Sequence, residues 1–214
     1  MLGLDLATLI ARAITLLIGF TVHEFAHAWT AYQLGDTTQI SQGRLTLNPR
    51  AHISPFWYLL AVLTGFGMAK PVYWHPALIQ MDVRKGGMLI AVVGPLSNLV
   101  LAVLAAIPVR LGLIALDSAS SSAFLPSPEY LLFIFILINL VMAVFNMIPI
   151  PPLDGYRVLL GLLPDKLAYE YQRIEPWGMF ILLGLIFLGG IGRLNLLGLI
   201  LGPPISLFFR LVTG

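Results

Sequence analysis

The chain has 214 residues, of which 58% are hydrophobic and only 10% are charged, and its net charge is +2. Soluble domains carry roughly 25% charged residues, so this composition excludes a soluble protein, and the high apolar content also excludes a disordered one. The balance of 12 basic and 10 acidic residues excludes a nucleic-acid surface, and the absence of cysteine excludes disulfides and thiol catalysis. The composition therefore predicts an all-α integral membrane protein in contact with the lipid bilayer.

The apolar segments predict about five to six transmembrane helices in one membrane-embedded domain over residues 1–214. A helix needs about 20 mainly apolar residues to cross the hydrocarbon core. Three segments form the expected core helices, at about 6–34, 88–112 and 131–149. Two further apolar segments, separated only by Arg193, predict a C-terminal helical hairpin at about 177–210, in which Pro203 and Pro204 kink or end the last helix.

The segment after the first span predicts short membrane-associated elements. β-forming residues and a glycine over Thr38–Thr46 favour a strand or a hairpin. Pro55–Ala69 is apolar, but its 15 residues are too few for a span, which favours a re-entrant or interfacial element. Because irregular backbone is tolerated at membrane depth only beside protein or water, we expect a polar cavity near this loop.

The distribution of Lys and Arg predicts the orientation, since basic loops stay on the cytoplasmic side. Nine basic residues fall in the loop 36–87, in the loop after Asp154 and at Arg210. Arg12, Arg110 and Arg193 fall on the opposite side. The N-terminus is therefore predicted outside and the C-terminus inside.

The strongest chemical signal is an H-E-x-x-H motif at His23–His27, which lies inside the first apolar span. On a helix, side chains four residues apart share a face, so both imidazoles can bind one metal ion. Zinc suits two His ligands, a carboxylate and a water, and Glu24 can accept a proton from that water. The alternative is a chance occurrence, but a Glu and two His residues in hydrocarbon would then cost several kcal/mol without compensation.

Asp154 is the expected third ligand, because it follows a long uncharged segment and a proline-rich turn that can direct its carboxylate back into the bundle. The alternative is an ordinary N-cap role at the start of the next helix. The two-His motif still needs a carboxylate, which favours the ligand role for Asp154. One Zn²⁺ per chain is therefore predicted.

Three asparagines lie within apolar spans, where an amide ordinarily hydrogen-bonds a neighbouring helix. Asn146, eight residues before Asp154, is a candidate to donate to a substrate carbonyl or to an oxyanion. Asn98, in the second core helix, is another candidate catalytic residue, and Asn139 is assigned to packing.

Three motifs, in this order, resemble those of the site-2 proteases, the family of intramembrane zinc metalloproteases. They are H-E-x-x-H at His23–His27, G-P-x-x-N at Gly94–Asn98 and N-x-x-P-x-x-P-L-D-G at Asn146–Gly155. The connecting segments Gly43–Pro49 and Ala69–Val72 resemble the compact bacterial branch, and the length leaves no room for a PDZ or CBS domain.

The resemblance implies a set of functional residues. Three of them, His23, His27 and Asp154, correspond to the zinc ligands, and Glu24 corresponds to the general base. Asn98 and Asn146 correspond to the asparagines near the site. The resemblance also implies a multi-pass protein of the bacterial plasma membrane, and the charge asymmetry predicts that its site lies toward the cytoplasmic side.

The sequence thus predicts an intramembrane zinc endopeptidase that hydrolyses a peptide bond in or near the transmembrane segment of a single-pass membrane protein. An extended substrate could pair with Thr38–Thr46 by β-addition. Two alternatives remain open. A non-catalytic zinc-binding regulator or chaperone would not need Glu24 as a base, and a metal transporter typically shows inverted repeats, which the sequence lacks.

Overall fold

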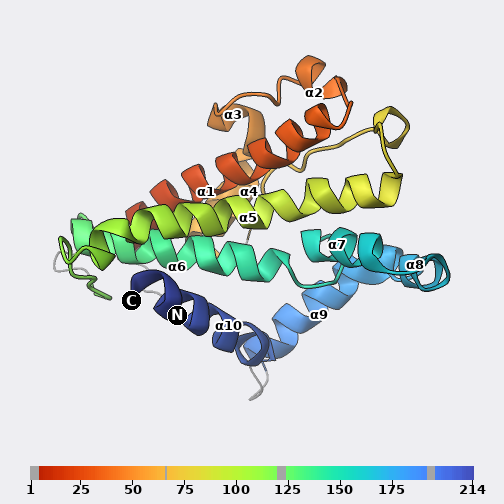
Figure 1. The fold of residues 1–214 in the computed structure, drawn as a ribbon. Coiled ribbons are helices and arrows are strands. Elements are labelled where there is room, and N and C mark those ends of the chain that lie inside the picture. The colour runs from red at the N-terminus through yellow and green to blue at the C-terminus, as the bar shows by residue number, and fades with distance from the viewer. Residues whose placement is uncertain (1–4, 66, 120–123, 192–195) are drawn as a thin grey trace.

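The computed structural model describes residues 5–65, 67–119, 124–191 and 196–214, and every regular element within these ranges is a helix (Figure 1). The long helices are α1 (Leu6–Gln33), α5 (Val83–Arg110), α6 (Pro128–Asn146) and α10 (Leu196–Thr213). Between α1 and α5 lie α2 (Thr38–Ser41), α3 (Pro49–His52), α4 (Pro55–Thr64) and η1 (Pro76–Leu78). Between α6 and α10 lie α7 (Asp154–Leu162), α8 (Asp165–Gln172), η2 (Glu175–Trp177) and α9 (Gly178–Ile191).

The three predicted core helices are present as α1, α5 and α6, which pack side by side (Figure 1). Each begins at a capping side chain that accepts a backbone N–H of the first turn, namely Asp5, Asp82 and Ser127. α6 ends three residues before Pro149, because the chain approaching a proline is biased away from the helical conformation. These helices set the frame for the site.

The described residues confirm an all-α membrane protein. Four helices, α1, α5, α6 and α10, are long and apolar enough to cross a membrane. The sequence predicted about five to six spans. The difference lies in α9, which has 14 residues and so falls short of the length that a span requires.

The strand predicted over Thr38–Thr46 is wrong. Thr38–Ser41 forms the short helix α2 instead, and the segment after it is irregular. The carboxylate of Asp36 accepts the backbone N–H and the hydroxyl of Thr38, which turns the chain into a helical start. Gln39 is fully buried and donates to both Asp36 and the Tyr73 carbonyl, so local capping and side-chain anchoring override the β-forming composition.

α4 belongs to the re-entrant element that the sequence predicted. Its last turn lies near the beginning of α1, where Arg12 donates to the Val62 carbonyl at 3.2 Å. The chain then returns, and the Lys70 N–H donates to the carbonyl of His52, just before α4 begins. The chain therefore enters α4 and comes back beside the same residue, His52, so the segment folds back on itself.

Buried polar side chains hold the returning segment, residues 69–75, in place. Arg44 donates to the carbonyls of Lys70 and Pro71 at 3.0 and 2.9 Å. The carboxylate of Asp36 accepts the backbone N–H of His75 at 2.9 Å. Burial opposes ionisation of Asp36, but the donors around it outweigh burial and lower the pKa of its carboxyl below the usual 3.8.

The C-terminal helices are present, but the predicted hairpin is wrong. Gly178, at the start of α9, packs against Pro151, whereas Gly214 lies beside Arg110 at the other end of the bundle. α9 and α10 therefore form an open V that runs from one end to the other (Figure 1). α10 continues through Pro203 and Pro204 and packs on α5 and α6, which brings the C-terminus to the end where α1 begins.

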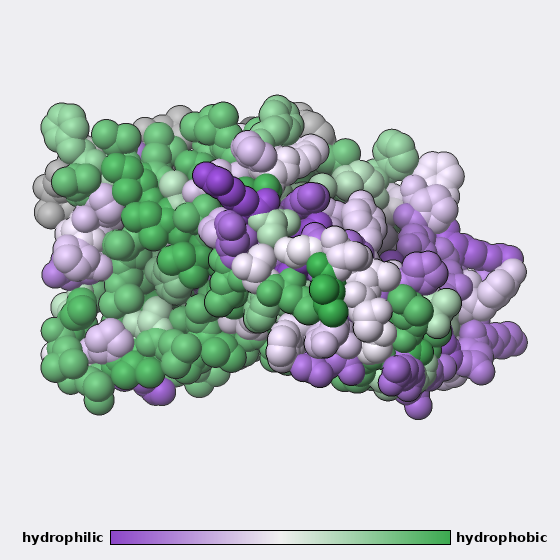
Figure 2. Space-filling view, turned by 90° about the horizontal axis from the view of Figure 1, so that it is seen from above, coloured by the Kyte–Doolittle hydropathy of each residue, from purple (hydrophilic) through white to green (hydrophobic). Residues whose placement is uncertain are grey.

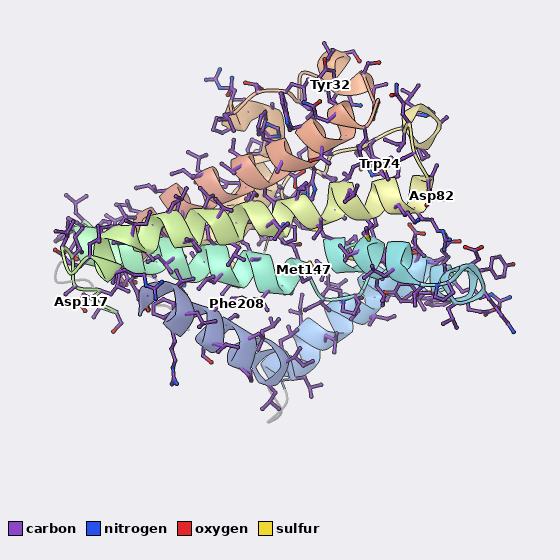
Figure 3. The ribbon with its side chains drawn as sticks, in the orientation of Figure 1. Tyr32, Trp74, Asp82, Asp117, Met147 and Phe208 are labelled. Atoms are coloured by element: carbon purple, nitrogen blue, oxygen red, sulfur yellow. The ribbon has the colours of Figure 1, made fainter. Side chains whose placement is uncertain are left out.

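The two ends of the bundle differ in polarity. Figure 2 shows apolar residues over one end of the visible face and hydrophilic residues gathered at the other. In Figure 3, Asp82 and Trp74 lie at the polar end and Asp117 lies at the opposite end. Arg210 lies with Arg110 at the apolar end, contrary to the prediction, and Arg193 lies outside the described residues. The polar end still holds five basic residues, which are Arg84 and Lys85 at the start of α5, Arg157 over the ring of Trp74, and Lys166 and Arg173 on α8 and at its end.

Candidate metal centre

The two histidines of the motif lie on one face of α1, as their spacing predicts. His23 and His27 are both buried, and their rings meet edge to face with centroids 4.6 Å apart. α1 is one continuous helix through this region, so the relative position of the two rings is fixed by the helix itself. Their Nε2 atoms point toward the same carboxylate.

That carboxylate is Asp154, the first residue of α7. Its oxygens lie 3.2 Å from Nε2 of His23 and 3.4 Å from Nε2 of His27. The prolines after α6 turn the chain, and α7 begins against the end of α6 near Met147 (Figure 3). Gly155 permits this approach, because a Cβ there would lie 2.2 Å from the Met147 carbonyl oxygen.

The three side chains lie close enough to hold one zinc ion. Zn–N and Zn–O bonds of about 2.0–2.1 Å place neighbouring ligand atoms of a tetrahedron about 3.3 Å apart, and Nε2 of each histidine lies near that distance from one carboxylate oxygen of Asp154, Oδ2 for His23 at 3.2 Å and Oδ1 for His27 at 3.4 Å. One atom from each side chain lies within 4.8 Å of the others, and two His and one carboxylate form a set that zinc prefers.

Gly94 of α5 makes room for both rings. A Cβ on this residue would lie 2.4 Å from Cε1 and Nε2 of His27 and 2.7 Å from Cε1 of His23. Real Cβ atoms essentially never come closer than 3.0 Å to another heavy atom. The glycine that opens the G-P-x-x-N motif is therefore required by the histidines and not only by close helix packing.

Each histidine is held from behind through its Nδ1 atom. Nδ1 of His27 lies 2.6 Å from the Ile90 carbonyl oxygen, and Nδ1 of His23 lies 2.6 Å from Oδ1 of Asn98. Both contacts leave Nε2 directed at Asp154. Outer hydrogen bonds of this kind fix the tautomer and the orientation of metal-binding histidines.

Glu24 lies next to His23 and is 7% exposed. Its Oε2 atom is buried and has no hydrogen-bond partner within the described residues. A buried carboxylate oxygen without a donor is costly, so its position indicates a role that involves a further molecule. Oδ2 of Asp154 is likewise buried without a hydrogen-bond donor.

The two asparagines that the sequence proposed as catalytic have different positions relative to the candidate ligands. Asn98 is fully buried and binds His23 directly, so it lies behind a candidate ligand. Asn146 is the last residue of α6, and its Nδ2 donates to the Met142 carbonyl at 3.0 Å. Asn139 was assigned to packing, but it accepts a hydrogen bond from Asn98. Its spacing of seven residues from Asn146, on the same face of α6, was the available signal.

Comparison with known proteins decides the family. The model of peptidase family M50 matches residues 111–189, a region that contains α7 and Asp154. A relative from Bacillus subtilis (strain 168), named "Putative zinc metalloprotease YwhC", is 39% identical over 170 residues, which cover 79% of this chain and 77% of the relative. The chain belongs to peptidase family M50. Membership of M50 confirms the resemblance to the site-2 proteases.

Two less similar relatives are longer than this chain. "Putative zinc metalloprotease Rip2" of Mycolicibacterium smegmatis is 31% identical over 83% of this chain and 66% of its own length. The protein of the same name in Mycobacterium tuberculosis H37Rv is 32% identical over 80% of this chain and 63% of its own length. No solved structure matches this chain.

Proposed function

We propose that this M50 protein is an intramembrane zinc metalloendopeptidase that hydrolyses a peptide bond in or near the transmembrane segment of a single-pass membrane protein. One observation carries the proposal. His23, His27 and Asp154 converge from α1 and α7 with one ligand atom of each within 4.8 Å of the others, and Glu24 lies one residue from the first of them. The motif sits on a helix that is long and apolar enough to cross a membrane.

His23, His27 and Asp154 would hold the zinc ion, which supplies Lewis-acid polarisation and makes a water molecule acidic enough to deprotonate near neutral pH. Glu24 takes the proton of the attacking water as general base and returns it to the leaving amine, which is the exchange expected of an H-E-x-x-H glutamate. Its buried Oε2 without a donor is suited to accept that proton. Asn146 uses one amide N–H in its own helix and has a second N–H for a substrate carbonyl.

The bundle also suggests how the protein lies in the bilayer. Five basic residues gather at the polar end, which favours placing this end in the cytoplasm of a bacterial plasma membrane. The site residues lie on the polar-end halves of α1 and α5 and at the start of α7. Water would then reach the site from the cytoplasmic side. A membrane-embedded substrate would have to unwind locally, because the hydrogen bonds of a helix shield its peptide bonds.

Cleavage of a single-pass reporter protein tests the proposal. The purified protein is placed in liposomes with zinc, and the wild type is compared with Glu24→Gln and with Glu170→Gln. Glu170 lies on the exposed surface of α8 and pairs with Arg173, so the same chemical change there is a matched control. We expect cleavage by the wild type and by Glu170→Gln, and loss of cleavage in Glu24→Gln.

Two results would contradict the proposal. Equal cleavage by the wild type and Glu24→Gln would exclude Glu24 as the base. Zinc binding without cleavage of any of a panel of single-pass reporters, together with full cellular function of Glu24→Gln, would favour a non-catalytic zinc-binding regulator.

A further inference from the structure

A line of side-chain amides links the candidate metal centre to α6. Oδ1 of Asn98 faces Nδ1 of His23 at 2.6 Å, and Nδ2 of Asn98 donates to Oδ1 of Asn139 at 2.9 Å. Nδ2 of Asn139 donates in turn to the Phe135 carbonyl at 2.8 Å. Both asparagines are fully buried. The three long helices α1, α5 and α6 are thus joined by one continuous set of hydrogen bonds.

The donor and acceptor roles along this line follow from its far end. A backbone carbonyl can only accept, so the atom of Asn139 that faces Phe135 must be the amide nitrogen. The oxygen of Asn139 then faces Asn98, which requires the nitrogen of Asn98 at that contact and leaves its oxygen for His23. An oxygen facing Nδ1 requires a proton on that atom, and in the neutral ring this leaves Nε2 with a free lone pair.

The two histidines differ in how firmly the acceptor that faces their Nδ1 atom is fixed. Nδ1 of His27 faces the Ile90 carbonyl, which is backbone and has no alternative end to present. His23 faces a side-chain amide, whose oxygen and nitrogen could exchange places. A second anchor on Asn98, the contact of its Nδ2 with the Gly19 carbonyl, is long at 3.3 Å. Asn139 therefore supplies the shorter contact that keeps the amide from turning over.

We propose that Asn139 is a positioning residue, which holds the amide of Asn98 in one orientation and thereby keeps the proton of His23 on Nδ1. This inference rests on the proposed metal site, because its consequence is that Nε2 of His23 faces Asp154 as a ligand. A reversed Asn98 amide would present N–H to Nδ1 and favour the proton on Nε2, the atom that has to bind the metal.

Two substitutions separate this role from packing. Asn139→Leu removes the acceptor for Asn98, whereas Asn139→Asp keeps an oxygen that accepts from Asn98 whether or not the carboxyl is ionised. Nitrogen NMR of histidine-labelled, metal-free protein reports the tautomer directly, and every protein compared carries Asp154→Ala, because the Asp154 carboxylate lies 3.2 Å from Nε2 of His23 and would itself favour a proton there. In this background we expect the Nδ1–H form of His23 with Asn139 and with Asn139→Asp, and a shift toward the Nε2–H form with Asn139→Leu. If Asn139→Leu does not fold, Asn139→Ala removes the same acceptor and repeats the test.

Zinc affinity, measured by competition with a chelator, gives an independent readout. We expect about 10–100-fold weaker binding in Asn139→Leu, the range typical of lost outer hydrogen bonds at metal-binding histidines, and nearly wild-type binding in Asn139→Asp. Thr15→Val is the matched control, because the fully buried Thr15 also donates to the carbonyl four residues earlier, that of Ala11, and Thr15 is not among the hydrogen-bond partners of Asn98 within the described residues. This control is expected to bind zinc as the wild type does.

Two outcomes would overturn the inference. An unchanged tautomer in Asn139→Leu would mean that the Gly19 contact alone holds Asn98, and equal changes in the Leu and Asp variants would mean that Asn139 acts only by filling space. Failure of the proposed function would look different. The wild type would bind no zinc, while the tautomer measured in the Asp154→Ala background would still depend on Asn139.

Discussion

Substitution of Gly94 by alanine adds one methyl group directly against the two candidate ligand rings. The new Cβ would lie 2.4 Å from the His27 ring, whereas ordinary contact begins at 3.4 Å, so the ring and α5 must separate by about 1 Å. The His27 ring cannot move away freely, because its Nδ1 lies 2.6 Å from the Ile90 carbonyl oxygen, and Ile90 lies one turn before Gly94 on the same helix. The displacement therefore has to break this hydrogen bond or move Nε2 away from Asp154.

The magnitude follows from this geometry. Overpacking of this kind costs about 1–3 kcal/mol of stability, and a 1 Å misplacement at a reacting centre can cost about 10²-fold in rate. We expect zinc affinity of Gly94→Ala to fall about 10–100-fold and cleavage to fall with it. The helices should remain folded, because alanine favours a helix over glycine.

The assay measures zinc affinity in detergent by chelator competition, with helix content followed by circular dichroism. Gly202→Ala is the matched control, since it makes the same change on another long helix where a Cβ would meet nothing within 4 Å. Zinc affinity in Gly94→Ala equal to that of Gly202→Ala would refute the reasoning, because the rings would then not depend on the space that Gly94 provides.

Two further predictions concern the elements around the site. Arg12→Met removes the donor that binds the Val62 carbonyl at the end of α4, and should lower the unfolding free energy by about 1.5–3 kcal/mol. Arg110→Met, at an exposed helix end, should change the unfolding free energy by no more than about 0.5 kcal/mol. Equal thermal stability of both variants in detergent would contradict this role of Arg12. Asp36 has a lowered pKa in the folded state, so its ionised form stabilises the fold above about pH 4 and this contribution is lost as the pH falls through the folded-state pKa. The stability difference between wild type and Asp36→Asn, measured by thermal unfolding from pH 3 to pH 7, should therefore be largest at neutral pH and shrink toward pH 3; a difference independent of pH would contradict it.

The sequence contained enough information to predict the three core helices and the group of His23, His27 and Asp154. Hydropathy and caps define the helices, because the hydrocarbon core imposes a minimum length and leaves few alternatives. The ligands could be paired because two of them are four residues apart on one helix, and a zinc site with two His ligands needs a further donor.

Features that depend on tertiary contacts could not be predicted from the sequence. Thr38–Thr46 has a β-forming composition, but the buried carboxylate of Asp36 starts a helix there. The direction of α10 depends on its packing against α5 and α6, which hydropathy does not encode. The backbone carbonyl of Ile90, which holds His27, carries no side-chain signal at all.

The distance along the chain between the candidate ligands has a consequence for biosynthesis. His23 and His27 lie near the beginning of the chain, whereas Asp154 follows after more than half of its length. During synthesis, α1 is therefore made long before α7 exists, and at that stage the two histidines of the motif lack their third candidate ligand. The candidate metal site can therefore be completed only when α7 has been made and has brought Asp154 to His23 and His27.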